Sequence, residues 1–259
     1  MIFDLRVFIG QSFDGTRQGV RELLATMDPL GIQKALACPF KPLSYRLDQA
    51  NEELAISIRP HADRLLGAAR IDPWQPEAAR ILVHSLDALG LRALYLNPWE
   101  EHFRVDLPQL DPILAIAEAR KIPVIIASGY PWMSEPLQVA KLAERWPGVN
   151  IVMTNGGQIN ISGLGQADAT LAMRKCPNLC LETAGVYRQD FIEESVTEFG
   201  AQRVLFGSGA PYFDQRYEVL RVLKAKVDDR SRSAMESANA LRLVGLGNPP
   251  GDLNDILTA

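Results

Sequence analysis

Residues 65–96 read LLGAARIDPWQPEAARILVHSLDALGLRALYL and contain one complete strand–helix–strand unit. The apolar runs at 65–71 and 91–96 have the length and composition of buried strands, and the segment between them has helical periodicity. Pro76 opens this helix, where proline is tolerated because the N–H that it lacks would have no helical partner. The stretch therefore predicts two strands joined by a helix, the repeating unit of α/β proteins.

The same alternation continues over the whole chain. Each of eight short β-rich runs is followed by a segment with helical periodicity, and the first of these helical segments is residues 16–27. A last helix is expected at about 230–244. The predicted strands are residues 2–9, 32–39, 65–71, 91–96, 122–127, 150–154, 178–182 and 203–206. Eight units in order favour an α/β fold, a single (β/α)8 TIM barrel with an additional C-terminal helix. An open doubly wound sheet is the alternative.

Length and composition fit one domain. Barrels of this kind need about 250 residues, and this chain has 259, of which 47% are hydrophobic. No linker or low-complexity segment divides it, so residues 1–259 are predicted to form one TIM-barrel domain, with the tail beyond Gly247 as a loosely held loop. The three cysteines, Cys38, Cys176 and Cys180, are too few and too irregularly spaced for a disulfide framework.

The charge balance narrows the choice of partners. The net charge is −4 and no block of lysine or arginine occurs, which disfavours nucleic acid and anionic membranes. The apolar runs are too short to span a bilayer, and the chain begins in a predicted strand rather than in a leader-like segment. We therefore expect a cytoplasmic protein with a small-molecule ligand. A homodimer or an assembly with a related paralogue is a further expectation.

The residues at the strand ends are the candidates for function. In such a barrel the loops that follow the strands form the functional mouth. Because side chains alternate along a strand, two residues separated by one can point into the barrel together. This rule pairs Arg6 with Phe8, Tyr95 with Asn97, Arg70 with Asp72, and Cys180 with Glu182. Which alternate set faces inward stays open at this point.

Several of these segments resemble the amidohydrolase-related TIM-barrel family, in particular its small-molecule decarboxylases, hydratases and lactone hydrolases. The resemblance rests on order and spacing and covers nearly the full length. The segments that carry it are FDLRVFIG at 3–10, ARIDP at 69–73, GLRALYLNPW at 90–99, VLFGS at 204–208 and NALRL at 239–243. It implies a (β/α)8 barrel with hydrolase or lyase chemistry on a small molecule.

The resemblance also implies where metal ligands would lie. The family normally has a His-x-His pair at the end of its first strand, where this chain has Arg6 and Phe8. The family's histidines after strands four, five and six and its aspartate after strand eight align with Asn97, Ala127, Asn155 and Gly209. Zinc needs imidazole, thiolate or carboxylate donors. Metal-dependent hydrolysis is therefore disfavoured, and we expect no metal and no cofactor.

Arg6 is the most informative of these replacements. Its guanidinium can take the place of the metal's positive charge and hold a carboxylate through two hydrogen bonds. The alternative is an internal ion pair with Glu182, Asp72 or Asp4.

The other candidate ligand-binding residues are polar or aromatic. Tyr95, Asn97 and Trp99 can form a polar and aromatic wall, with Phe8 beside them, although ordinary packing is the alternative, especially for Trp99. Three further candidates, Ser128, Asn155 and Ser208, lie in glycine-containing segments that can face a ligand or serve as simple connections.

Glu182 and His102 are the candidate catalytic residues, since a desolvated carboxylate or a loop histidine can move protons. Asp72 is expected to form a salt bridge, and solvent exposure is the alternative for His102. The leading hypothesis is a metal-free pocket for a small carboxylated molecule, with hydrolase or lyase activity as its inherited chemistry. The alternative is a catalytically silent paralogue that acts as a partner subunit or as a ligand-binding protein.

Overall fold

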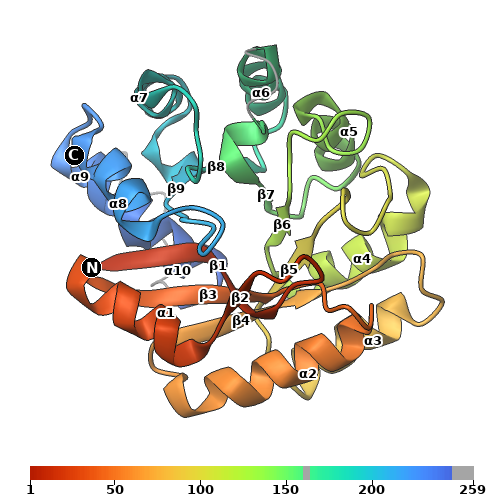
Figure 1. The fold of residues 1–259 in the computed structure, drawn as a ribbon. Helices are drawn as coiled ribbons and strands as arrows, with labels where there is room; N and C mark the ends of the chain where they lie inside the picture. The colour runs from red at the N-terminus through yellow and green to blue at the C-terminus, as the bar shows by residue number, and fades with distance from the viewer. Residues whose placement is uncertain (160–163, 247–259) are drawn as a thin grey trace.

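The computed structural model describes residues 1–159 and 164–246, in which a curved parallel sheet is surrounded by helices (Figure 1). Within these residues the sheet has nine strands in the order β2-β1-β3-β4-β5-β6-β7-β8-β9. All neighbours pair in parallel except β2, which is antiparallel to β1. The strands are β1 Ile2–Gln11, β2 Arg17–Gln18, β3 Ile32–Pro39, β4 Leu65–Arg70, β5 Ala93–Leu96, β6 Val124–Ile126, β7 Ile151–Met153, β8 Leu179–Glu182 and β9 Val204–Leu205.

Backbone hydrogen bonds close the sheet between its first strand and the segment that follows its last one. The Leu5 amide donates to the Phe206 carbonyl (3.1 Å), and the Phe8 amide donates to the Ala210 carbonyl (2.8 Å). In the other direction, the Gly209 amide donates to the carbonyl of Arg6 (2.8 Å). These bonds confirm the predicted closed barrel and exclude the open doubly wound sheet.

Helices cover the outside of the barrel between successive strands (Figure 1). They are α1 Val20–Met27, α2 Leu47–Ile58, α3 Ala78–Asp87, α4 Asp111–Arg120, α5 Pro136–Arg145, α6 Leu164–Lys175, α7 Gln189–Phe199 and α8 Gln215–Lys224. The additional C-terminal helix is present as α9 Asp229–Ser233, a π-helical turn at Ala234–Ala238, and α10 Asn239–Leu243. No described helix has both the length and the apolar character that crossing a membrane requires. The predicted loose tail beyond Gly247 lies outside the described residues.

The buried apolar residues form two layers. The larger layer lies between the sheet and the outer helices, and the smaller one fills the barrel. Leu243 of α10 belongs to the inner layer together with Phe3 and Leu36, so the last helix closes one end of the barrel. Many inner residues are small, including Cys38, Ala68, Ala93, Ala127 and Cys180. Small side chains leave room inside for the long side chains of Arg6, Arg70 and Tyr95.

One predicted element differs from the structure. The sequence predicts a helix over 16–27, but Arg17–Gln18 is a short strand and the helix begins at Val20. The register pairs Gly10 with Gln18, and the Gln18 side-chain amide donates to the carbonyl of Phe8 (2.8 Å). The chain therefore folds back on β1 before the helix starts, a tertiary contact that periodicity does not reveal.

Candidate ligand pocket

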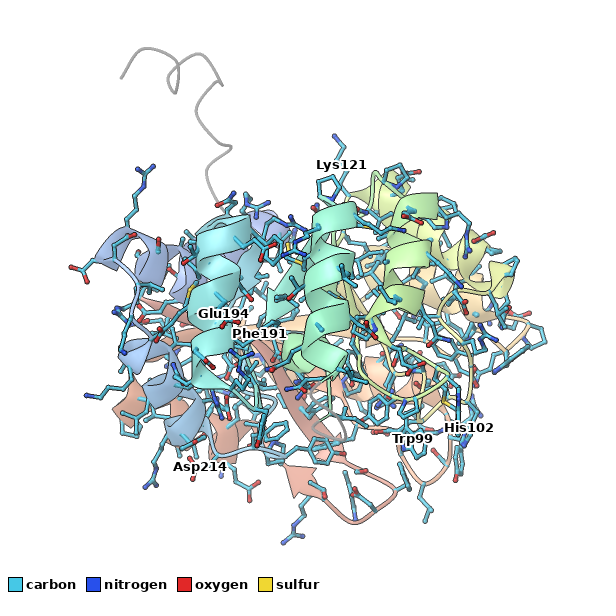
Figure 2. All side chains as sticks on the ribbon, turned by 90° about the horizontal axis from the view of Figure 1, so that it is seen from above. Trp99, His102, Lys121, Phe191, Glu194 and Asp214 are labelled. Atoms are coloured by element: carbon cyan, nitrogen blue, oxygen red, sulfur yellow. The ribbon has the colours of Figure 1, made fainter. Side chains whose placement is uncertain are left out.

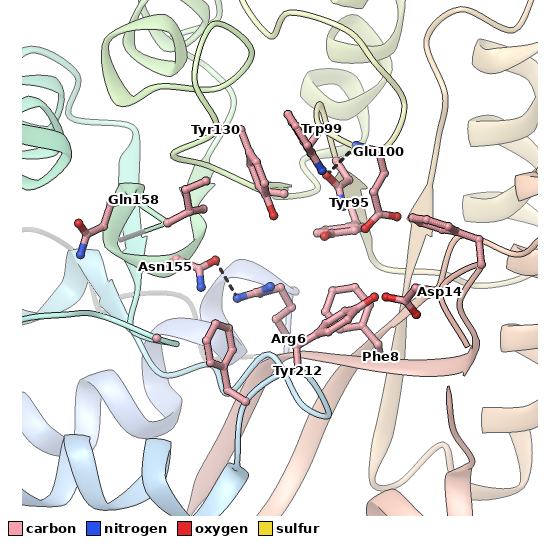
Figure 3. A pocket seen from close by; sticks show the side chains of 16 residues that line it. Arg6, Phe8, Asp14, Tyr95, Trp99, Glu100, Tyr130, Asn155, Gln158 and Tyr212 are labelled. Carbon is pink, nitrogen blue, oxygen red and sulfur yellow. Dashed lines mark hydrogen bonds between the residues drawn. The ribbon is translucent and has the colours of Figure 1, made fainter. Parts of the chain in front are cut away.

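A cavity of about 410 Å³ opens where the parallel strands end (Figure 3). Its size is within the range of small-molecule sites, about 300–1,000 Å³. Aromatic residues make up seven of the sixteen lining residues but only 7% of the chain. These seven are Phe8, Phe13, Tyr95, Trp99, Tyr130, Tyr212 and Phe213. Such enrichment favours a ligand with a flat apolar face.

Arg6 reaches the pocket from β1 and is only 5% exposed. Its Nη2 lies 3.2 Å from Oε2 of the fully buried Glu182, and its Nε donates to Oε1 (3.4 Å). Burial by itself lowers the pKa of Arg6, but the adjacent Glu182 carboxylate raises it above its ordinary value, so the guanidinium stays charged. Arg6 therefore forms the internal ion pair that was the alternative, with Glu182 as its partner, and it also lines the pocket.

Asn155 fixes this ion pair from the loop after β7. Its side-chain oxygen accepts from Arg6 Nη2 (3.2 Å), and its backbone amide donates to Oε2 of Glu182 (2.9 Å). Its backbone has φ +57°, in the left-handed region that asparagine tolerates better than most residues. The backbone amide of Asn155 therefore binds the internal carboxylate of Glu182.

A second buried charge cluster lies beside the pocket. Arg70 of β4 donates to Oε2 of Glu100 (2.5 Å) and to Oε1 of Glu101 (2.8 Å). Asn51 holds the Arg70 backbone through both its side-chain oxygen and its nitrogen. Burial raises the pKa of Glu101 to about 7, against the opposing charge of Arg70. Glu100 lines the pocket, so this cluster brings a carboxylate to its wall.

The aromatic residues form two groups of touching rings. Trp99 stacks on Tyr130, with ring centroids 5.4 Å apart and planes 13° apart. Phe8 contacts Tyr95 and Tyr212 edge to face at 5.5 and 5.4 Å. Trp99 is 53% exposed and lines the pocket, so the wall interpretation describes it better than the packing interpretation.

Six of the residues predicted to bind a ligand line this one cavity, namely Arg6, Phe8, Tyr95, Asn97, Trp99 and Asn155. The other two, Ser128 and Ser208, are fully buried and do not line it. The Ser128 hydroxyl donates to the Ile126 carbonyl, and the Ser208 hydroxyl accepts from the Ala210 amide. The Ser128 hydroxyl thus binds the backbone of its own turn, and the Ser208 hydroxyl binds both its own turn and Asp4.

The two predicted proton-transfer residues also lie outside the lining. Glu182 is completely buried, and both of its oxygens accept hydrogen bonds from Arg6. His102 is exposed at the outer edge of the molecule (Figure 2), with its carbonyl bonded to the indole of Trp74. Asp72, expected in a salt bridge, instead accepts from the backbone amide of Trp74 (2.9 Å).

Sequence reasoning missed part of the lining. Asp14, Glu100, Tyr130, Gln158, Tyr212 and Phe213 lie in loops several residues past the strand ends. Strand alternation does not extend into such loops. One signal was available in the sequence. Arg70, at the end of the third predicted strand, needs an acidic partner, and two adjacent acids, Glu100 and Glu101, follow the fourth predicted strand by a few residues.

The side chains present do not fit the metal that the family resemblance implies. Phe8, Ala127 and Gly209 offer no side-chain donor, and a Cβ at position 209 would lie 3.1 Å from Nη2 of Arg6. The guanidinium thus fills the space beside position 209. Over residues 1–159 and 164–246, no group of three or more His, Cys, Asp or Glu side chains could hold a metal ion.

Comparison with solved structures supports the fold. A dihydroxybenzoic acid decarboxylase from Polaromonas sp. JS666, with bound manganese and an inhibitor, has a TM-score of 0.77 at 15% identity, covering 96% of this chain and 98% of that one. A TIM-barrel protein from Bordetella bronchiseptica has a TM-score of 0.74 at 20% identity, covering 95% and 98%. The 5-carboxyvanillate decarboxylase of Sphingomonas paucimobilis has a TM-score of 0.73 at 18% identity, covering 88% and 84%.

Sequence comparison supplies the family. A search of curated proteins finds no significant match. The family model described as amidohydrolase, however, matches residues 11–246, which is most of the chain. Together with the closed barrel and the pocket at its strand ends, this match means that the chain belongs to the amidohydrolase family.

Proposed function

We propose that the pocket binds a small planar molecule with a carboxylate, and that Arg6 supplies the positive charge without a metal. The observation that carries this proposal is the state of the Arg6 guanidinium. Its Nε and Nη2 are used by Glu182 and Asn155, while its Nη1 has no hydrogen-bond partner among the described residues. Arg6 lines the cavity, and a charged N–H there that no described residue accepts from favours an anionic acceptor.

The rest of the lining supports this ligand class. The stacked rings of Trp99 and Tyr130 and the edge-to-face rings around Phe8 are suited to a flat ring between them. The solved decarboxylases with the same fold are named for aromatic carboxylates. We carry only the carboxylated aromatic class from them to this chain.

Binding without turnover is the role that the geometry favours. Glu182 is committed to Arg6 and His102 is exposed outside the pocket, so neither of the residues expected to move protons is available to a ligand. Hydrolase or lyase activity is the second candidate, because Glu100 and the Tyr130 hydroxyl line the cavity and can exchange protons there. Mass spectrometry of a carboxylate library after incubation with the protein separates the two candidates.

Calorimetric titration with benzoate and its neutral amide, benzamide, tests the binding proposal. We expect benzoate to bind roughly tenfold or more tightly than benzamide, because only the carboxylate forms a charge-assisted bond with Arg6. The double variant Arg6→Met with Glu182→Gln removes the buried charge and its partner together, and it should lose this preference. Equal affinity of wild type for the two probes, or benzoate binding that disappears when metal is removed with a chelator, would overturn the proposal.

A further inference from the structure

The outer part of the same pocket has the opposite charge. Asp14 and Glu100 are the acidic residues of its lining, and Arg6 is the basic one. Glu100 is paired with Arg70, whereas Asp14 has no ion pair within residues 1–159 and 164–246. Arg6 is balanced by Glu182. The Asp14 carboxylate accepts from the Thr16 backbone amide (2.8 Å) but no cation neutralises it within the described residues. A ligand therefore meets a negative charge at the mouth in addition to the guanidinium deeper inside.

Figure 3 shows that these charges are separated across the cavity. The Asp14 and Glu100 carboxylates and the Tyr212 hydroxyl lie on one side, and the contact between Arg6 and Asn155 lies on the other. Burial raises the pKa of Tyr212, and the charges of Glu100 and Asp14 raise it further, as expected when both carboxylates lie near its hydroxyl.

The cations near Glu100 do not cancel this acidic side. Arg70 pairs with Glu100 and Glu101, and Lys41 lies 3.9 Å from Glu101. Arg70 thus pairs with Glu100 at the wall of the pocket, and Lys41 and Glu101 do not line the pocket. Asp14 is the charge left over on the side that faces the ligand.

Tyr95 independently indicates that this space takes a polar ligand. Its side chain is 1% exposed and lines the pocket, and its hydroxyl has no hydrogen-bond partner among the residues that the structure describes. This hydroxyl is not one of the fully enclosed unpartnered atoms of the described residues, so it opens to the cavity. It can therefore form a hydrogen bond with a polar ligand there.

We propose that Asp14 and Glu100, with the rings of Phe13 and Tyr212, bind an ammonium group. This inference rests on the proposed function and narrows it, because the ligand then carries a carboxylate near Arg6 and an ammonium group at its other end. Carboxylates neutralise the cation, and aromatic faces attract it through their quadrupole. Phe13 and Tyr212 are 45% and 42% exposed, so both rings are accessible at the mouth.

Four para-substituted or parent probes test the proposal in calorimetric titrations at neutral pH. The first is 4-(aminomethyl)benzoate, which has both charges, and the second is 4-(hydroxymethyl)benzoate, in which a neutral hydroxyl replaces the ammonium group. The third is benzoate, which has only the carboxylate, and the fourth is benzylamine, which has only the ammonium group. We expect the zwitterion to bind roughly tenfold more tightly than 4-(hydroxymethyl)benzoate. A partly desolvated ammonium group that contacts a carboxylate and an aromatic ring would account for a difference of this size. Equal binding of these two probes overturns the ammonium site.

Two variants localise the effect. Asp14→Asn and Glu100→Gln should each reduce the preference for the zwitterion to about threefold or less, since each removes one carboxylate, and leave benzoate binding unchanged or tighter. The matched control is Asp63→Asn, an exposed carboxylate in the loop before β4, which should keep the full preference. A preference that survives both pocket variants overturns the assignment.

The probes also separate this proposal from the one on which it rests. Benzylamine that binds while benzoate does not supports the ammonium site and contradicts the carboxylate role of Arg6. Benzoate that binds as tightly as 4-(aminomethyl)benzoate supports the carboxylate role of Arg6 and contradicts the ammonium site. Failure of all four probes to bind contradicts both proposals.

Discussion

At the scale of single residues, the ion pair between Arg6 and Glu182 is the chemical centre of the molecule. A guanidinium with 5% exposure is stable only beside a carboxylate that is equally removed from water. Glu182 gives that carboxylate, and Asn155 holds both partners through its side chain and backbone. The pair therefore explains how an arginine can be accommodated at this buried position in β1.

Removing Glu182 should be costly. Glu182→Ala leaves the Arg6 charge buried without its partner, and we expect the free energy of unfolding to fall by about 3–5 kcal/mol. Urea denaturation followed by circular dichroism measures it. The control is Glu194→Ala, which breaks an exposed pair with Arg188 (Glu194 is labelled in Figure 2) and should cost less than about 1 kcal/mol. Similar losses in the two variants would contradict the central role of the pair.

Asp4 should make the stability depend on pH. Burial raises the pKa of Asp4 from 3.8 to about 6, although hydrogen bonds from Ser208 and Gln215 oppose the shift. The folded protein thus holds this proton more tightly than the unfolded chain. The protonated Asp4 therefore stabilises the folded state fully below pH 4. As the pH rises from 4 to 6 this contribution is lost, and the free energy of unfolding falls by about 3 kcal/mol.

Asp4→Asn tests this dependence. The variant should flatten the fall in unfolding free energy between pH 4 and 6, measured by urea denaturation at each pH. Part of the slope should remain, because burial also raises the pKa of Glu101, to about 7. Parallel curves for wild type and variant would show that Asp4 does not titrate in this range.

At the scale of elements, the alternating pattern predicted most strands and helices, with differences of a few residues at the ends. β3 begins and ends at the residues that the pattern indicates, because flanking turn residues delimit it. β2 and the left-handed turn at Asn155 were not predicted, since both depend on contacts with distant strands. Local periodicity cannot report such contacts.

The C-terminal helix offers a prediction at this scale. Leu243 of α10 is 5% exposed and packs in the inner layer of the barrel, so Leu243→Ala should lower the free energy of unfolding by about 2–5 kcal/mol. Leu223 of α8 is 45% exposed, and Leu223→Ala should change the free energy of unfolding by less than about 1 kcal/mol. Thermal unfolding of both variants checks the difference. Equal effects would mean that the last helix does not close the barrel.

At the scale of the whole molecule, the sequence predicted the architecture better than the site. Counting eight units was enough for the barrel, and the strand ends supplied six lining residues, including Arg6 and Tyr95. The residues that were missed lie in loops, where no periodic rule applies. Glu182 was assigned a proton-transfer role, and its three hydrogen bonds with Arg6 do not support that role. Which buried charges meet is decided by the closed barrel and not by their spacing along the chain.

The bonds that close the barrel have a consequence for biosynthesis. The Ser208 amide reaches back to the carboxylate of Asp4, a partner 204 residues earlier in the chain. Until Ser208 has left the ribosome, one edge of β1 in the nascent chain has no partner strand. Open strand edges of this kind pair with other chains. Translation arrested shortly before that point should therefore yield aggregation-prone fragments, whereas arrest after α10 should yield a closed domain.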